Sequence, residues 1–98
     1  MVLEFYQRIN ALKEDNPKLK VLLAMGGWTD SSGDKYYRLV SSSQARKNFA
    51  QEAGIFLKQA GFDGLHLDWQ WPVCWQADCS KGPSTDKSNY ILLAKVSY

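Results

Sequence analysis

The sequence predicts an α/β fold in the order helix, strand, helix, strand, helix. Three observations lead to it: an unbroken apolar run over residues 21–25, an alternating stretch over residues 65–70, and apolar residues at helical spacing between them. An unbroken run is typical of a strand covered on both faces, whereas alternation is typical of a strand with one polar face. Two strands joined by a helix are expected to lie parallel through a right-handed crossover, the repeating unit of a (β/α)8 barrel.

Three helices are expected around these strands. The first is terminated by Asn16-Pro17 and is marked by apolar residues at helical spacing, namely Phe5, Ile9 and Leu12. The second has serines 41–43 as candidate N-caps and Gly61 just past its end, and its apolar positions are Ala45, Phe49, Ala53, Phe56, Leu57 and Ala60. The third begins near Thr85 or Asp86, with Tyr90, Leu93 and Val96 on one side.

Each strand ends in residues that suggest a site. The first runs into Gly26-Gly27-Trp28, and paired glycines let the main chain pass close to a neighbour or a ligand. In the second strand, alternation turns His66, Asp68 and Gln70 to one side and the residues Leu65, Leu67 and Trp69 to the other. In a barrel the polar side would face the interior, with Gln70 at the carboxyl-terminal mouth, where barrel sites are built.

The second strand and its flanks, Phe62-Asp63-Gly64-Leu65-His66-Leu67-Asp68-Trp69-Gln70-Trp71-Pro72, resemble the signature of glycoside hydrolase family 18. This family of chitinases and chitinase-like lectins ends a barrel strand with Asp-Gly-x-Asp-x-Asp-x-Glu, followed by Tyr-Pro. Its Ser-x-Gly-Gly motif is similar to residues 24–27, with Ala24 in place of the serine. The loop over residues 71–83 is similar to that of large multi-domain arthropod chitinases.

The resemblance implies a partial barrel. A complete (β/α)8 barrel needs ~250 residues, whereas this chain has 98. We therefore expect residues 1–98 to form a fragment with about two of the eight strands and no second domain. The rest of a barrel would then be the first partner of this chain, because its first strand needs neighbours on both sides.

The family mechanism implies roles for four positions. A single Glu protonates the leaving oxygen, and the N-acetyl group of the substrate acts as nucleophile. By position, Gln70 replaces that acid, Asp68 matches the Asp that orients the N-acetyl group, His66 replaces the middle Asp, and Asp63 matches the first. An amide cannot transfer a proton, so loss of catalysis is expected. His66 lies roughly 13 Å deeper along the strand and is expected to pair with Asp68 instead.

Four tryptophans have two possible uses, stacking on sugar rings or packing in the core. Trp69 is expected in the core because it falls on the apolar side of its strand. Trp28, Trp71 and Trp75 follow strand ends, so contact with substrate and core packing both stay open for them. Trp71 stands where the family has Tyr, so a phenolic hydroxyl is missing there.

The cysteines and the net charge bear on the location of the protein and on its possible partners. Cys74 and Cys79 flank a short loop that a disulfide could close, although pairing with cysteines outside the chain or free thiols are alternatives. The net charge is only +2, and the Lys and Arg residues form no basic run. Neither nucleic acid nor an anionic membrane is therefore expected as a partner. No metal or organic cofactor is implied. An extracellular location is expected, with any signal peptide upstream of these residues.

Three functions follow from this pattern. The first is a non-catalytic domain that binds chitin or N-acetylglucosamine oligosaccharides. The second is an active chitinase that takes an acid from elsewhere in the barrel. The third is a degenerate domain that binds no sugar and serves as a spacer or an interaction surface. A preserved scaffold with a disabled acid position favours the first function. The presence of Gln70, His66 and Ala24 in place of the family's residues is compatible with the third.

Overall fold

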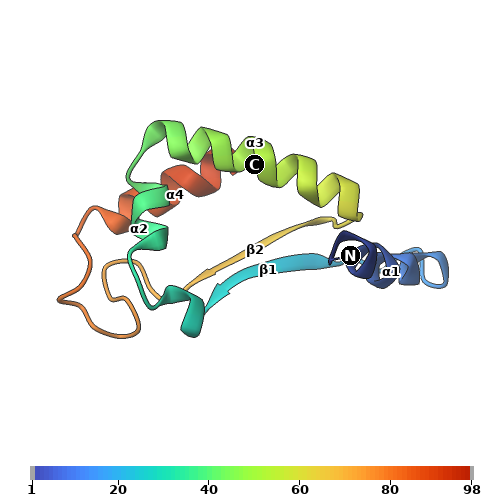
Figure 1. Cartoon of the computed structure of the whole chain (residues 1–98), viewed down its shortest axis with the longest axis horizontal. Helices are drawn as coiled ribbons and strands as arrows, with labels where there is room; N and C mark the ends of the chain where they lie inside the picture. The colour runs from blue at the N-terminus through green and yellow to red at the C-terminus, as the bar shows by residue number, and fades with distance from the viewer. Residues whose placement is uncertain (1, 98) are drawn as a thin grey trace.

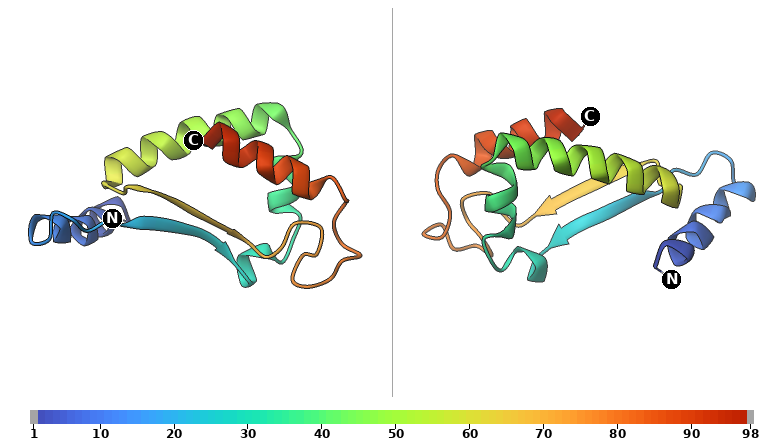
Figure 2. Two further views of the ribbon diagram at one scale, coloured as in Figure 1. Left: turned by 180° about the vertical axis from the view of Figure 1, so that it is seen from behind. Right: turned by 45° about the horizontal axis from the view of Figure 1, so that its top comes forward.

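The computed structural model describes residues 2–97, with side chains described for residues 2–95. Its helices and strands follow the predicted order: α1 (Val2–Asn10), the 3-10 turn η1 (Ala11–Glu14), β1 (Leu22–Gly27), the 3-10 turn η2 (Thr29–Ser31), α2 (Lys35–Val40), α3 (Ser43–Ala60), β2 (Gly64–Trp69) and α4 (Asp86–Ser97). The strands β1 and β2 form a parallel two-stranded sheet. Helices α3 and α4 lie side by side over one face of it (Figures 1 and 2).

The two faces of β2 behave as its alternation predicts. The register pairs Leu22 with Gly64 and continues to Gly27 opposite Trp69. The odd-numbered side chains of β2 turn toward the helices, and Trp69 joins a buried cluster with Tyr36, Val40 and Leu93. This core therefore lies between the carboxyl half of the sheet and helices α2, α3 and α4, directly beneath the ends of the strands.

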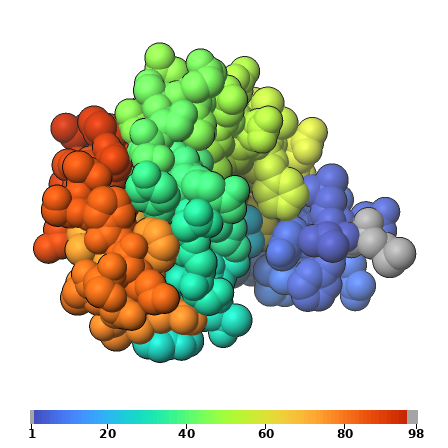
Figure 3. All heavy atoms as spheres, turned by 60° about the vertical axis from the view of Figure 1, so that its left-hand side comes forward, coloured from blue at the N-terminus to red at the C-terminus, as the bar shows by residue number. Residues whose placement is uncertain are grey.

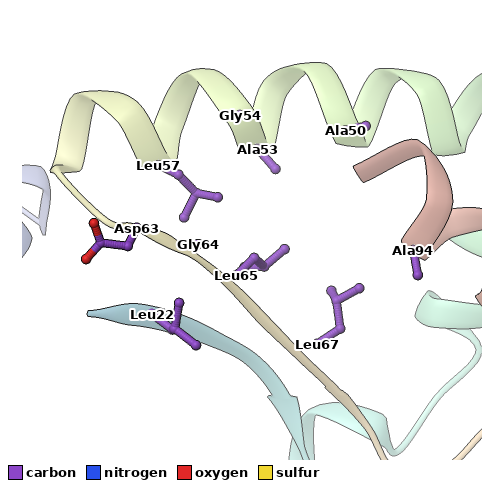
Figure 4. Close-up of a pocket in the computed structure, with 10 residues that line it drawn as sticks. All are labelled: Leu22, Ala50, Ala53, Gly54, Leu57, Asp63, Gly64, Leu65, Leu67 and Ala94. Atoms are coloured by element: carbon purple, nitrogen blue, oxygen red, sulfur yellow. The ribbon is translucent and has the colours of Figure 1, made fainter. Parts of the chain in front are cut away.

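The amino half of the sheet is packed less tightly. A hollow of about 490 Å³ separates it from α3. Figure 4 shows Leu65 and Leu67 of β2 directed toward the small residues Ala50, Ala53 and Gly54 of α3. Leu57 of α3 also lines this hollow, and the buried cluster of the core lies instead under the half of the sheet that supports the strand ends.

Helix α3 begins and ends where the sequence predicts. Ser42 is its N-cap, and the Ser42 Oγ accepts the N–H of Ala45 at 3.1 Å. Gly61 is its C-cap in the left-handed conformation, with φ of 85°, and donates its N–H to Leu57 at 2.9 Å. These two caps set the length of α3, the longest helix in the connection that brings β2 alongside β1.

The N-terminal helix differs from the prediction. Helix α1 ends at Asn10, before the expected Asn16-Pro17, and η1 continues the chain. The buried Asn10 side chain donates to the carbonyl of Ala60 at 2.8 Å and to that of Tyr6 at 3.1 Å, and these bonds fix the end of α1 to the end of α3. The sequence could not indicate this bond, because it joins residues 50 positions apart.

Helices α2 and α4 differ in how well the sequence predicts them. Helix α2 was not expected, because its six residues are too few to show a helical period. In α4, Tyr90 is half-buried and Leu93 is buried, as predicted, whereas the side chain of Val96 lies outside the described residues. Over the described part of the chain, no helix combines the length and apolar character needed to cross a membrane.

Candidate functional site

The polar residues singled out by the sequence gather where β1 and β2 end. The segment that follows β1 and the long loop that follows β2 leave the sheet at this same edge (Figure 1). Figure 3 shows the loop after β2, in orange, lying against the segment after β1, in teal. The two strand ends and these two segments form the candidate site.

Asp68 and Gln70 are in direct contact. The Gln70 Nε2 lies 3.2 Å from both carboxylate oxygens of Asp68, so one amide group donates to the whole carboxylate. His66 is exposed, and among the described residues no hydrogen bond or ion pair joins it to Asp68. The expected pairing is therefore not formed, and the Asp68 carboxylate is bound by the Gln70 amide instead. Gln70 takes the place that the sequence suggested for His66.

The main chain of Gln70 is held from both sides. Its N–H donates to the Oγ of Ser31 at 2.9 Å, and its carbonyl accepts the N–H of Gln76 at 2.9 Å. Ser31 is fully buried and also donates its hydroxyl to the carbonyl of Gly27 at 2.7 Å, so it joins the two strand ends. The peptide bond between Gln70 and Trp71 is cis. Ser31 was missed, because a serine in a polar loop has no sequence pattern that reveals burial.

The paired glycines at the end of β1 let the two strands come unusually close. Gly26 pairs with Asp68 and has a φ of 119°. A side-chain Cβ at Gly26 would lie 2.3 Å from the carbonyl oxygen of Asp68. The expected close approach of backbone at the paired glycines is confirmed, and it is an approach to the strand that carries Asp68.

Two tryptophans form an exposed pair at the strand ends. The rings of Trp28 and Trp71 lie edge to face, with centroids 5.7 Å apart and an interplanar angle of 73°. Their exposed fractions are 49% and 45%. We call Trp28 and Trp71 the tryptophan pair. Trp69 is buried and stacks on Tyr36 at 5.9 Å, which confirms its predicted place in the core.

Trp75 lies apart from the tryptophan pair and has a structural contact. Its indole N–H donates to the Oδ2 of Asp86 at 2.9 Å, and its ring packs against the core cluster. The same Oδ2 accepts the N–H of Val73 at 2.9 Å, and Asp86 is fully buried. Asp86 therefore anchors the loop after β2 to the start of α4. The sequence indicated Asp86 only as a possible helix start, where an acidic residue is usually exposed.

A disulfide closes the centre of this loop. Cys74 and Cys79 are bonded to each other, as the short spacing suggested. Within the loop, Ala77 donates its N–H to Cys74 at 2.9 Å, and Trp75 and Asp78 form an antiparallel bridge. Three residues that are not glycine, Val73, Gln76 and Ala77, have positive φ values of 70°, 48° and 70°. The loop is thus held in one conformation that its residues would rarely adopt alone.

The floor beneath the strand ends is fixed by a second group of side chains. Hydrogen bonds from Lys35 and Tyr36 lower the pKa of Asp30. Burial, together with the bond to Asp30, raises the pKa of Tyr36. Tyr36 therefore stays protonated near neutral pH, and its ring supports Trp69, the residue between Asp68 and Gln70 in the chain.

Asp63 lies at the opposite end of β2 from Gln70. Five residues of strand place it about 16 Å from Asp68. Its Oδ2 accepts the N–H of Val21 at 2.7 Å and lies 2.8 Å from the Nζ of Lys13. The position that matched the first Asp of the family signature thus joins the start of β2 to the segment before β1. The structure does not bring Asp63 together with Asp68 and Gln70.

The contacts of Asp63 predict a pH dependence. The bond to Lys13 and the N–H of Val21 lower the pKa of Asp63 below its ordinary value of 3.8. A lowered pKa in the folded state means that the stabilisation is present above the unfolded pKa and is lost as pH falls through the folded value. We expect Asp63→Asn to reduce the free energy of unfolding at pH 6 and to have little effect once the pH lies below the lowered pKa of Asp63.

Urea unfolding at a series of pH values would measure this difference in a complete barrel domain that carries these 98 residues, called the complete domain below. Asp15→Asn is the matched control, because the Asp15 side chain is exposed and makes no hydrogen bond or ion pair among the described residues. Equal pH dependence of the parent and Asp63→Asn would contradict the prediction.

Metal ligands do not cluster in the described residues. No group of three or more His, Cys, Asp or Glu side chains is placed there to hold an ion. The chemistry available at the strand ends is that of a carboxylate, an amide and exposed indole rings. Such groups can accept and donate hydrogen bonds and offer flat apolar faces, which suits a polyhydroxylated ligand.

Comparison with known proteins assigns the family. Residues 2–96 match the family model of the glycosyl hydrolases family 18. The chain is 49% identical over 92 residues to probable chitinase 10 of Drosophila melanogaster, covering 94% of this chain and 4% of that protein. It is 43% identical over 89 residues to chitotriosidase-1 of Mus musculus, covering 90% of this chain and 18% of that protein. The chain thus spans a small part of the length of these relatives.

Solved structures agree with the family model. A mutant of catalytic domain 2 of the Group II chitinase of Ostrinia furnacalis, in complex with (NAG)5, superposes with a TM-score of 0.90 at 51% identity. The match covers 96% of this chain and 24% of that chain. The parallel strand pair, the crossover helix and the strand-end site of this protein are therefore one part of a chitinase-like (β/α)8 barrel. The chain belongs to glycosyl hydrolase family 18.

Proposed function

We propose that these residues are part of a family 18 domain that binds chitin or N-acetylglucosamine oligosaccharides without hydrolysing them. The observation that carries the proposal is the contact of Gln70 with Asp68, in which the amide donates to both carboxylate oxygens. Gln70 stands at the acid position of the family signature, and an amide has no proton to transfer near neutral pH. Loss of general acid catalysis removes about 10²- to 10⁴-fold in rate.

Three features support retained binding of sugar. Gln70 and Asp68 keep a donor and an acceptor at the mouth of the strands, and the exposed tryptophan pair beside them offers flat faces to pyranose rings. The chitinase domain of Ostrinia furnacalis quoted above is a mutant in complex with (NAG)5. The remaining strands of a barrel would complete the cleft around these residues.

The proposal includes an extracellular location. The disulfide between Cys74 and Cys79 closes a loop at the site itself. Disulfides persist in oxidising compartments, and chitin is an extracellular polymer. We therefore expect the sugar to be met outside the cell, where the loop stays closed.

Hydrolysis and binding by the complete domain test the proposal. We expect the parent and Gln70→Ala to hydrolyse chito-oligosaccharides no faster than buffer, while calorimetry detects binding to the parent. Clear turnover by the parent that is lost in Gln70→Ala would instead identify an active chitinase. Absence of both turnover and binding would identify a degenerate domain. Either result would overturn the proposal.

Binding should depend on the tryptophan pair. We expect Trp28→Ala to weaken affinity for a chito-oligosaccharide about 10-fold or more, because exposed aromatic rings at the centre of a site commonly contribute over 1 kcal/mol. Trp28→Phe should lose less, since it keeps a flat ring. Isothermal calorimetry on the complete domain would measure both. Phe5→Ala is the control, because Phe5 is 58% exposed on α1, far from the strand ends; an equal loss in that variant would contradict the prediction.

A further inference from the structure

We propose that Gln76 is a positioning residue that holds the tryptophan pair in its edge-to-face arrangement, and thereby sets the affinity of the site for its sugar. The second part rests on the proposed function, whereas the first concerns the protein alone. Neither the family signature nor the glycine turn includes Gln76, which lies in the middle of the disulfide loop.

The two members of the tryptophan pair belong to different segments. Trp28 follows β1 and Trp71 follows β2, and both lie beyond the last residues that the strands pair. Both rings are about half exposed, so surrounding core does not fix their positions. The arrangement therefore needs a contact that joins the two segments to each other.

Gln76 supplies that contact with two hydrogen bonds. Its side-chain Nε2 donates to the carbonyl of Trp28 at 2.9 Å. Its main-chain N–H donates to the carbonyl of Gln70, one residue before Trp71, at 2.9 Å. One residue thus fixes the main chain of the first tryptophan and the peptide that leads into the second.

The loop holds Gln76 firmly in place for this role. The Cys74–Cys79 disulfide encloses it, and Trp71 donates its N–H to the carbonyl of Cys74 at 3.3 Å. Gln76 has a φ of 48°, a conformation that glycine or asparagine adopts more readily. The closed loop therefore holds the main chain of Gln76 in a left-handed conformation that Val73 and Ala77 share.

Circular dichroism of the complete domain can follow the arrangement without any sugar. Two indoles held at a fixed angle and short separation couple their transitions and give an exciton couplet in the far ultraviolet. The spectra of Trp28→Ala and Trp71→Ala assign this couplet, because each variant should lack the signal of the tryptophan pair. We expect Gln76→Ala to lose most of it. The control Lys81→Ala lies in the same loop and should keep it, because the Lys81 side chain makes no hydrogen bond or ion pair among the described residues.

Gln76→Gly separates positioning from simple loop closure. Glycine suits the positive φ and keeps the main-chain N–H, so this variant should fold even if Gln76→Ala does not. If Gln76 only closes the loop, Gln76→Gly will keep the couplet and the sugar affinity of the parent, and the proposal is overturned. If the side chain positions Trp28, the couplet will be lost although the melting temperature is maintained.

Binding measurements on the same variants complete the test. We expect Gln76→Gly to bind (NAG)5 about fivefold more weakly than the parent, which is the usual effect of one hydrogen bond. If Gln76→Gly loses the couplet and the parent binds no sugar, the positioning role is upheld and the proposed function is rejected. If Gln76→Gly keeps the couplet and the parent binds the sugar, only the positioning role is rejected.

Discussion

Replacing Gly26 with alanine is expected to destabilise the complete domain by roughly 3 kcal/mol or more. The new Cβ would lie 2.3 Å from the carbonyl oxygen and 2.6 Å from the carbonyl carbon of Asp68. Both are main-chain atoms, so no side-chain rotation can relieve the contact, and β1 would have to move away from β2. The φ of 119° adds a conformational penalty. Urea unfolding of the complete domain would measure the loss.

Two other glycines are matched controls for this effect. Gly27 has a φ of 92°, but a Cβ there would meet nothing within 4 Å, so Gly27→Ala should lose only about 1–3 kcal/mol for its backbone conformation. Gly33 has neither constraint, and Gly33→Ala should be close to neutral. The expected order of destabilisation is Gly26, then Gly27, then Gly33. Equal losses at Gly26 and Gly27 would show that the collision with β2 is unimportant.

Replacing Asp86 with alanine is expected to lower the free energy of unfolding by about 2–4 kcal/mol. The change would leave the N–H of Val73 and the indole N–H of Trp75 without their shared acceptor, Asp86 Oδ2. Gly82 packs closely against this oxygen, because a Cβ at Gly82 would lie only 2.6 Å from it. We therefore expect the loop after β2 to separate from α4 and the fluorescence of Trp75 to shift to longer wavelength.

Two variants calibrate the effect of Asp86. Asp86→Asn keeps an oxygen of the same shape at the acceptor position and should lose clearly less stability than Asp86→Ala. Asp34→Ala removes an exposed ion pair with Arg38, at 3.1 Å, and should change stability by under about 0.5 kcal/mol. If Asp86→Ala and Asp34→Ala were equally mild, Asp86 would not anchor the loop.

Much of the fold could be predicted because its signals are local. The apolar period of α3, its cap at Ser42 and Gly61, and the alternation of β2 each lie within a few residues of sequence. Once a helix is recognised between the two strands, parallel pairing is expected, because parallel strands need such a crossover connection. The end of α1 was wrong because Asn10 forms its decisive hydrogen bond with Ala60, and a local pattern carries no information about that distance in sequence.

The site was predictable in its strand residues and much less so in its loops. Alternation correctly placed Asp68 and Gln70 on one face, where they touch. The partners that hold Gln70 could not be inferred, because Ser31 reaches it across 39 positions. Trp75 follows a strand end like Trp28 and Trp71, yet it turns toward Asp86 and the core. Loop tryptophans of identical appearance thus acquire different roles from tertiary contacts alone.

The way Gln70 is held has an evolutionary consequence. Its main chain is gripped by Ser31 and Gln76, while its side chain bonds only to Asp68 among the described residues. Exchange of an acid for its amide at this position leaves every main-chain contact intact, so selection for a stable fold does not oppose it. Chemistry at the mouth of such a barrel is therefore exposed to drift after gene duplication, and copies that keep their shape can take up new roles without first being rebuilt.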